Sequence, residues 1–363
     1  MLVYKGDWKE ARGLFKQWWE GELERGPLLQ VISPRKGVSR WRGWNSWTVL
    51  RYRNNPSRIV KSFESWCSMT FFGGVAFPNL WINFGPGVLG AFLGATPKFT
   101  GNTVWFGAAW NKKISKSLDE ISELEIDQRN EWWRSLIQVT LEVSKSATGR
   151  YIVGMTDIGG VLDVIASLRG SLKLIKDMFY RPNEVERAIW HVLDLWHWCY
   201  NKLTDLIGQE GTSAWMGLWC PQNWYPIQCD FAALLSPKLF QRFVLPHIDE
   251  QCKRLDFTIY HLDGPRQIPH LEMLLQIEEL TGIQWVPGAS MDARGYGCGS
   301  SVWFPIYRKI LSVGKRLVIQ VPPREIKTLL KELPSHELIL IQTYCQTQSE
   351  AKRFLSSFEK IRA

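Results

Sequence analysis

Cysteine is scarce in this sequence. Its 363 residues include seven cysteines, an odd number, and no two of them form a CxxC pair. A small fold held together by disulfides is therefore excluded, because such proteins carry cysteines at high density and usually in an even count. Scattered thiols are typical of the reducing cytosol, so we expect a cytoplasmic protein.

The sequence also lacks an apolar leader and an uninterrupted membrane span. Charged residues lie close to the N-terminus and no apolar core follows them, which argues against a secretory signal. The 33 residues between Glu64 and Lys98 carry no charge, and a spanning helix needs only about 20 apolar residues. Glycines and prolines such as Gly73, Pro78 and Pro86 interrupt this segment, so we predict a buried strand, a loop and a short helix, and no membrane association.

Neither sign of charge dominates. There are 44 Lys and Arg against 35 Asp and Glu, a formal charge of +9. We interpret this excess as spread along the chain, whereas nucleic-acid binding favours a clustered basic patch. We therefore expect no nucleic-acid binding. A small-molecule substrate is expected instead, and an anionic one is compatible with the positive charge. A hydrophobic content of 45% with 20 Trp excludes a disordered chain.

Strand-like apolar runs alternate with helical patterns along the chain. The clearest helical pattern runs from Asn183 to Ile207, and another spans about 118–146. Eight strands in such alternation predict a (β/α)8 TIM barrel, with an open doubly wound sheet as the rival fold. Residues 1–75 are expected to form an N-terminal helical and loop extension with a lid, and residues 76–363 one compact barrel. The expected strands are Leu28–Ser33, Leu80–Phe84, Tyr151–Thr156, Ala214–Trp219, Phe257–His261, Gly282–Val286, Arg316–Gln320 and Glu337–Gln342.

A glycine motif follows the second expected strand. Residues Gly85 to Gly90 match the GxGxxG pattern of dinucleotide-binding turns. The acidic partner that would contact the ribose about 20 residues later is missing, since the next acidic residue is Asp119. We interpret the glycines as tight-turn residues at the end of a strand, where they can still face a ligand.

Catalytic candidates stand at the ends of the third and fifth expected strands. His261 and Asp263 are two apart on one strand, so both side chains can point into the mouth of a barrel. They could hold a metal ion or act as an acid/base pair, and Cys345 after the last strand could complete a zinc site with an open position. Asp157 is a further catalytic candidate. The alternatives are purely structural roles: Asp157 caps a helix, Asp263 forms a turn, and the Cys345 thiol is inert.

Aromatic and amide residues near the same end are candidates for substrate binding. The stretch after the fourth strand is too aromatic for a plain connection, and we expect a closed aromatic pocket with few polar groups at its floor. Such walls suit a methylated cation through cation–π attraction. The candidate substrate-binding residues are Asn83, Trp219, Tyr225, Asp230, Tyr260, Trp285 and Gln342.

Four stretches resemble the uroporphyrinogen decarboxylase superfamily, which also contains cobalamin-dependent methyltransferases. The likeness extends over about residues 55–360 and implies a TIM barrel with its site at the C-terminal strand ends. In the methyltransferase branch zinc sits on a His-x-Cys pair and a later Cys. Here His261 matches the His, Asp263 replaces the first Cys and Cys345 falls near the second. The stretches are Phe77–Gly94, Thr156–Gly170, Cys229–Pro246 and Tyr260–Gly288.

The resemblance implies methyl transfer between a small methylated substrate and a corrinoid carrier protein, with zinc as the candidate metal. A harder carboxylate ligand in place of a thiolate changes the zinc chemistry that this branch uses. The alternative is a cofactor-free decarboxylase acting on a carboxylated or tetrapyrrole-like substrate, with Arg266 or Arg294 as its cationic partner. Asn83 stands about where true decarboxylases carry an Asp. A non-catalytic binding protein on the same barrel is a third hypothesis, and a homodimer is compatible with the sequence.

Overall fold

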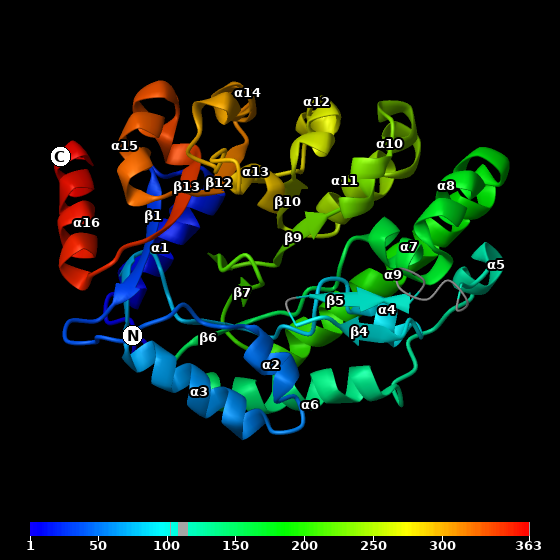
Figure 1. Ribbon diagram of the computed structural model, residues 1–363, viewed down its shortest axis with the longest axis horizontal. Helices are drawn as coiled ribbons and strands as arrows, with labels where there is room; N and C mark the ends of the chain where they lie inside the picture. The colour runs from blue at the N-terminus through cyan, green and yellow to red at the C-terminus, as the bar shows by residue number, and fades with distance from the viewer. Residues whose placement is uncertain (102, 108–114, 363) are drawn as a thin grey trace.

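The computed structural model describes residues 1–101, 103–107 and 115–362, and its centre is a seven-stranded sheet (Figure 1). The strand order is β2-β1-β13-β12-β11-β10-β9. Neighbours pair in parallel except β1 and β2, which are antiparallel. The strands are β1 (Leu28–Pro34), β2 (Thr70–Gly74), β9 (Trp224–Gln228), β10 (Phe257–Asp263), β11 (Gly282–Val286), β12 (Arg316–Gln320) and β13 (Ile339–Tyr344).

Three smaller sheets complete the strand pairing. In the first, β3 (Asn79–Trp81) lies parallel to β6 (Ile152–Gly154). The second is the antiparallel hairpin of β4 (Pro97–Phe99) and β5 (Val104–Phe106). The third is the short hairpin of β7 (Thr212–Ser213) and β8 (Trp219–Cys220).

The fold is mixed α/β with a large, mostly parallel sheet, and among the described residues this sheet does not close into the expected barrel. At one edge, β2 takes the hydrogen-bonding side of β1. Beside β6, the N–H of Met155 donates to the carbonyl of Ser213 in the β7–β8 hairpin at 2.8 Å. Extra segments therefore satisfy backbone groups that a closed barrel would pair between its own strands.

The expected strand at Ala214–Trp219 is wrong, because this segment forms the turn of the β7–β8 hairpin and the next long strand starts at Trp224. The other expected strands match within a few residues at their ends. The helix expected over 118–146 is two helices, α5 (Leu118–Ile121) and α6 (Glu131–Ala147). Asn130 caps the start of α6, where its side chain accepts from the N–H of Trp132 at 2.8 Å.

Helices surround the strands (Figure 1). The longest, α9, buries one apolar stripe and ends at Gly208, whose φ of 58° allows the left-handed helix cap. No helix in the described ranges is long and apolar enough to cross a membrane. The helices are α1 (Trp8–Glu20), α2 (Trp47–Arg51), α3 (Pro56–Ser68), α4 (Leu89–Phe92), α5 (Leu118–Ile121), α6 (Glu131–Ala147), α7 (Val161–Arg169), α8 (Ser171–Tyr180), α9 (Pro182–Ile207), α10 (Pro237–Phe243), α11 (Leu245–Lys253), α12 (Leu271–Leu275), α13 (Ala289–Asp292), α14 (Phe304–Ser312), α15 (Pro323–Glu332) and α16 (Gln348–Arg362), and the short 3-10 turns are η3 (Asp230–Leu234), η4 (Pro265–His270), η5 (Ser301–Trp303) and η6 (His336–Leu338).

The two ends of the sheet are covered differently. At the N-terminal end of β12, the Arg316 guanidinium donates to the carbonyl oxygens of Trp18 and Trp19, which fixes α1 there. Residues 35–46, which belong to the segment expected to form a lid and are called the lid below, follow the C-terminal end of β1. The Trp66 indole N–H donates to the carbonyl of Arg42 in this segment. The lid belongs to a segment more basic than an even spread of charge would give. Nine Lys and Arg and no Asp or Glu stand between Glu24 and Glu64: Arg25, Arg35, Lys36, Arg40, Arg42, Arg51, Arg53, Arg58 and Lys61.

Candidate functional site

His261 stands near the C-terminal end of β10. Its Nδ1 lies 2.6 Å from Oε1 of Gln284, the residue opposite it on β11. The ring of Trp215, from the tip of the β7–β8 hairpin, meets the imidazole edge to face at 5.1 Å between centroids. With Nδ1–H donating to an amide oxygen, Nε2 keeps its lone pair and can act as a base or a metal ligand.

Asp263 and Asp230 stand beside His261. One ligand atom from each of the three side chains can be chosen so that all lie within 4.8 Å of one another. Asp263 comes from the same strand two residues later, as the alternation of side chains requires. Asp230 begins the turn after β9, and Asp163 fixes that turn by accepting from the N–H groups of Asp230 and Phe231 at 3.0 and 2.7 Å.

The electrostatics of this group are dominated by carboxylates. Burial raises the pKa of Asp157 to about 7, and the charge of Asp230 adds to the increase. Burial also raises the pKa of Asp163 and of Asp230, reinforced by Asp230 and by Asp263 respectively. The pKa of His261 is lowered by burial, against the attraction of Asp263. Asp230 is exposed and His261 and Asp263 are partly buried. Because carboxylates this close together disfavour each other's ionisation, a bound cation would relieve part of this cost.

The donor set fits a divalent metal ion. One imidazole nitrogen and two carboxylate oxygens are ligands that zinc and other first-row divalent ions accept. The structure does not bring Cys345 into this group, which corrects the expected trio of ligands. Cys345 follows β13, where its N–H bonds to the carbonyl of Ile32 on β1, and two strands separate β13 from β10. Its thiol is buried, which raises its pKa to about 11.

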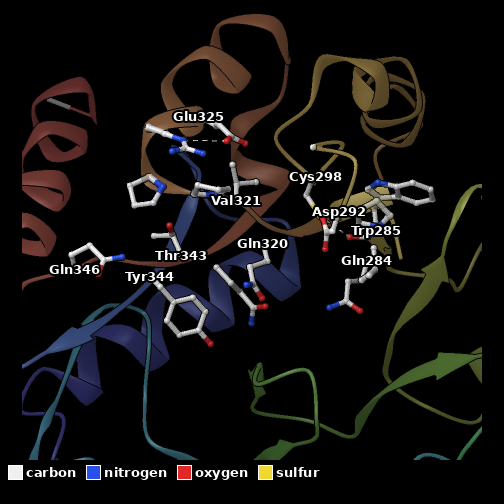
Figure 2. A pocket seen from close by; sticks show the side chains of 18 of the residues that line it. Gln284, Trp285, Asp292, Cys298, Gln320, Val321, Glu325, Thr343, Tyr344 and Gln346 are labelled. Atoms are coloured by element: carbon white, nitrogen blue, oxygen red, sulfur yellow. Dashed lines mark hydrogen bonds and ion pairs between the residues drawn. The ribbon is translucent and has the colours of Figure 1, made fainter. Parts of the chain in front are cut away.

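Three cavities open around these residues. The mouth cavity, about 420 Å³, lies between the lid, the hairpin tip and the ends of β11–β13. A larger cavity of about 730 Å³ lies beside β11–β13 and α15 (Figure 2). A third, of about 360 Å³, includes Asp163 and Asp230. The first two share the residues Gln284, Gln320, Gln342, Thr343 and Tyr344.

Four glutamines line the mouth cavity, so the expectation of few polar groups there is wrong: Gln30, Gln284, Gln320 and Gln342. Gln342 Nε2 donates to Gln30 Oε1 at 2.8 Å and to the carbonyl of Met216 at 2.9 Å. Gln30 Nε2 in turn donates to the carbonyl of Gly217 at 2.9 Å. These two side chains therefore hold the tip of the β7–β8 hairpin against the mouth cavity. Gln342, expected to bind substrate, does line both shared cavities.

Two of the expected aromatic residues contact the core instead of a cavity. Trp219 is 2% exposed and packs against Trp8, and its indole N–H donates to the carbonyl of Glu210 at 3.2 Å. It lies on β8, past the hairpin tip, so Trp215 takes the place at the mouth. Tyr225 is buried, and its hydroxyl donates to the carbonyl of Thr156 at 2.7 Å. Both side chains are therefore packing residues and not walls of the cavities described above.

The remaining expected residues also divide into residues buried in the core and residues that line a cavity. Tyr260 is fully buried and bonds to Gln267, because it alternates with His261 on the strand. Asn83 is buried as well, and its Nδ2 donates to Ser46 Oγ at 2.9 Å, which ties the lid to the loop at Gly85. Trp285 is buried on β11, packs on Trp303 at 4.9 Å and lies along the larger cavity.

Sequence reasoning missed Trp215, Gln284 and the anchoring role of Asp163. A signal existed for Gln284, since a lone glutamine interrupts the otherwise apolar strand GIQWV. The same pattern marks Gln30 in LLQVIS and Gln342 in LILIQT. A polar side chain in a buried strand needs a partner, so each of these positions points to an interior polar site.

Comparison with known proteins gives one line of information, on the fold. No family model and no curated protein matches the sequence. Among solved structures, a methyltransferase from Methanosarcina mazei is similar, with a TM-score of 0.59 and 12% sequence identity. The likeness covers 97% of this chain and 99% of that chain. The arrangement of strands and helices is therefore shared over nearly the full length of both.

Proposed function

We propose that this protein is an enzyme of methyl transfer whose reaction centre is a divalent metal ion, with zinc as the first candidate, held by Asp230, His261 and Asp263. The observation that carries the proposal is the approach of their ligand atoms to within 4.8 Å of one another. They meet where the strands of a parallel sheet end, the usual place for an α/β active site. The fold likeness to a methyltransferase supports the reaction class.

Each residue has a separate role in this proposal. His261 would bind the metal through Nε2 while Gln284 holds its ring. The metal would act as a Lewis acid on the substrate or the acceptor. Asp157 is buried and lines none of the three cavities. Burial raises its pKa to about 7, so its part in the reaction would be to hold a proton behind the site. Its Oδ1 accepts from the N–H of Gly159 at 2.9 Å, which fixes the carboxyl group.

The finer parts of the proposal rest on the sequence resemblance. A corrinoid carrier protein would be the partner that takes or gives the methyl group. The fold would be a variant of the eight-stranded barrel in which β1, β3, β6 and β9–β13 correspond to the barrel strands. The interruptions beside β1 and β6 would then be departures of this chain from the closed form.

The alternative, a cofactor-free decarboxylase, finds less support in the charges. Arg266 and Arg294 are exposed and line none of the three cavities. The third cavity carries Asp163 and Asp230, which would repel a carboxylated substrate.

The metal site is tested by metal analysis of the purified protein after dialysis against zinc. We expect about one bound ion per chain, lost in His261→Ala and Asp230→Asn. His191→Ala is a matched control, because His191 binds the carbonyl of Leu124 on another part of the molecule. A wild-type protein that binds no divalent ion would overturn this part of the proposal.

The reaction is tested by mixing the zinc-loaded protein with cob(I)alamin and candidate methyl donors, and following the formation of methylcobalamin in the visible spectrum. We expect formation that depends on donor and enzyme, and at least a tenfold slower rate in His261→Ala. Decarboxylation of a supplied substrate, with no methyl transfer from any donor, would favour the lyase instead.

A further inference from the structure

We propose that the mouth cavity binds a small N-methylated ammonium compound that also carries an oxygen acceptor. The inference rests on the proposed function in one respect, that this compound is the source of the methyl group. In that transfer the C–N bond would break, the Co(I) of the corrinoid partner would supply the electron pair of the new Co–C bond, and the tertiary amine would leave with the electron pair of the C–N bond. Its binding follows from the walls of the cavity alone.

Among the described residues, the charged side chains that line the three cavities are mostly acidic. The chain has an excess of basic residues, 44 against 35, yet among the residues that the structure describes Arg324 is the one basic residue on these walls. Its side chain is 85% exposed and contacts Glu325. The acidic residues on the walls are Asp163, Asp230, Asp292, Glu325 and Glu350. These carboxylates lie on the two neighbouring cavities, while the described lining residues of the mouth cavity are uncharged and the adjoining lid carries Arg40 and Arg42.

The mouth cavity itself offers aromatic rings without charge. Its walls include Trp44, Trp81 and Trp215, and no Asp, Glu, Lys or Arg stands among its lining residues. Trp81 is half-buried and makes no ring contact with another aromatic side chain in the described part of the chain. An indole face is the best partner that a protein offers to a quaternary ammonium group. The Trp81 ring is thus available to a methylated cation.

The same walls present hydrogen-bond donors that lack a partner. The indole N–H groups of Trp44, Trp81 and Trp215 are buried and make no hydrogen bond with the described residues. Thr343 is 2% exposed, lines both the mouth and the larger cavity (Figure 2), and its hydroxyl is also unpartnered. Buried donors without acceptors are costly. An oxygen on the ligand would satisfy them, whereas a bare alkylammonium ion would not.

These two sets of groups define the ligand. Indole faces select a methylated ammonium head, and unpartnered donors select a carboxylate or hydroxyl oxygen on the same small molecule. The cavity of about 420 Å³ is large enough for such a compound together with water. Glycine betaine and choline share this chemistry and differ in the oxygen group.

Calorimetric titration of the zinc-loaded protein tests the charge. Choline is compared with 3,3-dimethylbutan-1-ol, which has the same shape and no positive charge. We expect choline to bind at least tenfold more tightly. Equal affinities, or no binding of choline and of glycine betaine alike, would overturn the proposal.

Variants test the two walls separately. Trp81→Leu should lower the affinity for choline by about tenfold. Trp190 is exposed on α9, so Trp190→Leu should leave this affinity unchanged. Thr343→Val keeps the side-chain volume and removes the hydroxyl. It should lower the affinity for glycine betaine and leave the affinity for tetramethylammonium unchanged. If Trp81→Leu and Trp190→Leu bind choline equally well, the mouth cavity is not the site.

The binding titration and the methyl-transfer assay can each give a negative result without the other. Binding of choline or glycine betaine without transfer to cob(I)alamin would leave the ligand class standing and remove the proposed reaction. Transfer from an uncharged methyl donor, with neither cation bound, would leave the reaction standing and remove the ligand class.

Discussion

Nδ1 of His261 and Oε1 of Gln284 lie 2.6 Å apart, and the two residues face each other in the register of β10 and β11. The register alone brings them together, because neighbouring residues of parallel strands point to the same side of the sheet. An amide oxygen on Nδ1 holds the ring in one orientation and one tautomer. Gln284 is therefore a positioning residue for whatever Nε2 binds.

Replacing Gln284 tests this role. Gln284→Met keeps the length of the side chain and removes the acceptor, so the imidazole loses its fixed orientation. We expect the affinity for zinc to fall by about 10–100-fold, as for other groups that orient a metal-binding histidine. Competition with a chromophoric chelator measures the affinity.

Gln320→Met is the matched control for this measurement. Gln320 lies on the neighbouring strand β12, lines the same two cavities and makes no hydrogen bond to His261. Its replacement should leave zinc affinity unchanged. Equal losses in the two variants would show that cavity polarity, and not the contact with His261, governs metal binding.

Much of the fold could be predicted from the sequence, because apolar periodicity marks buried strands and helices directly. The run from Asn183 to Ile207 is one example, and α9 matches it within a residue. The segment Ala214–Trp219 is apolar and short, a pattern that predicts a buried strand, but it forms the turn of a hairpin. Its burial comes from insertion into the mouth, and the hydrogen bonds that hold it there are made by side chains distant in sequence.

The site was predictable only where its residues share a strand. His261 and Asp263 are two residues apart, and alternation places both on one face. Asp230 was expected near the substrate, and its approach to His261 depends on how β9 and the turn after it pack. Cys345 is expected as a third ligand because it follows the last strand, and strand order places it apart from that pair. Spacing along a chain does not determine distance across a sheet.

Trp219 offers a test of the distinction between core and cavity. It is 2% exposed, packs on Trp8 and lies under the Arg12 guanidinium at 4.8 Å. Trp219→Ala should lower the free energy of unfolding by about 3–5 kcal/mol, as for other buried large aromatic residues. Urea unfolding measures this change. The surface substitution Trp190→Ala should cost less than about 1 kcal/mol, and a large loss of choline affinity in a fully stable Trp219→Ala protein would contradict the assignment to the core.

His247 on α11 should make the protein sensitive to acid. It is fully buried, and burial lowers its pKa from 6.5 to about 3, opposed only by the Gln251 side chain. The folded state thus keeps the ring neutral while the unfolded chain takes up a proton below pH 6.5. Stability from this residue is complete above pH 6.5 and is lost as the pH falls toward 3.

The expected size of this effect is about 2 kcal/mol between pH 7.5 and pH 5, at about 1.4 kcal/mol per unit below 6.5. Urea unfolding at both pH values, for the wild type and for His247→Leu, measures it. The variant should lose less stability on acidification. His197, whose pKa burial lowers to about 4, acts in the same direction and is present in both proteins. Identical losses would mean that the pKa of His247 is the same in the folded and the unfolded states.

The hairpin tip depends on Gln342 for its place in the mouth. Gln342 Nε2 donates to the carbonyl of Met216 and to Gln30, which in turn binds the carbonyl of Gly217. Gln342→Leu leaves a buried carbonyl without its donor, at a cost of about 1–3 kcal/mol in the free energy of unfolding. Because Trp215 stands next to these residues and against His261, the same variant should also weaken zinc binding.

Urea unfolding and chelator competition on one sample separate the two consequences. Gln320→Leu is the matched control, since this glutamine lines the same cavities and makes no contact with the hairpin carbonyls. A drop in stability with unchanged zinc affinity would mean that the hairpin tip supports the fold and that Trp215 does not position His261. A loss of both in Gln342→Leu, and of neither in Gln320→Leu, is the outcome that the hydrogen bonds require.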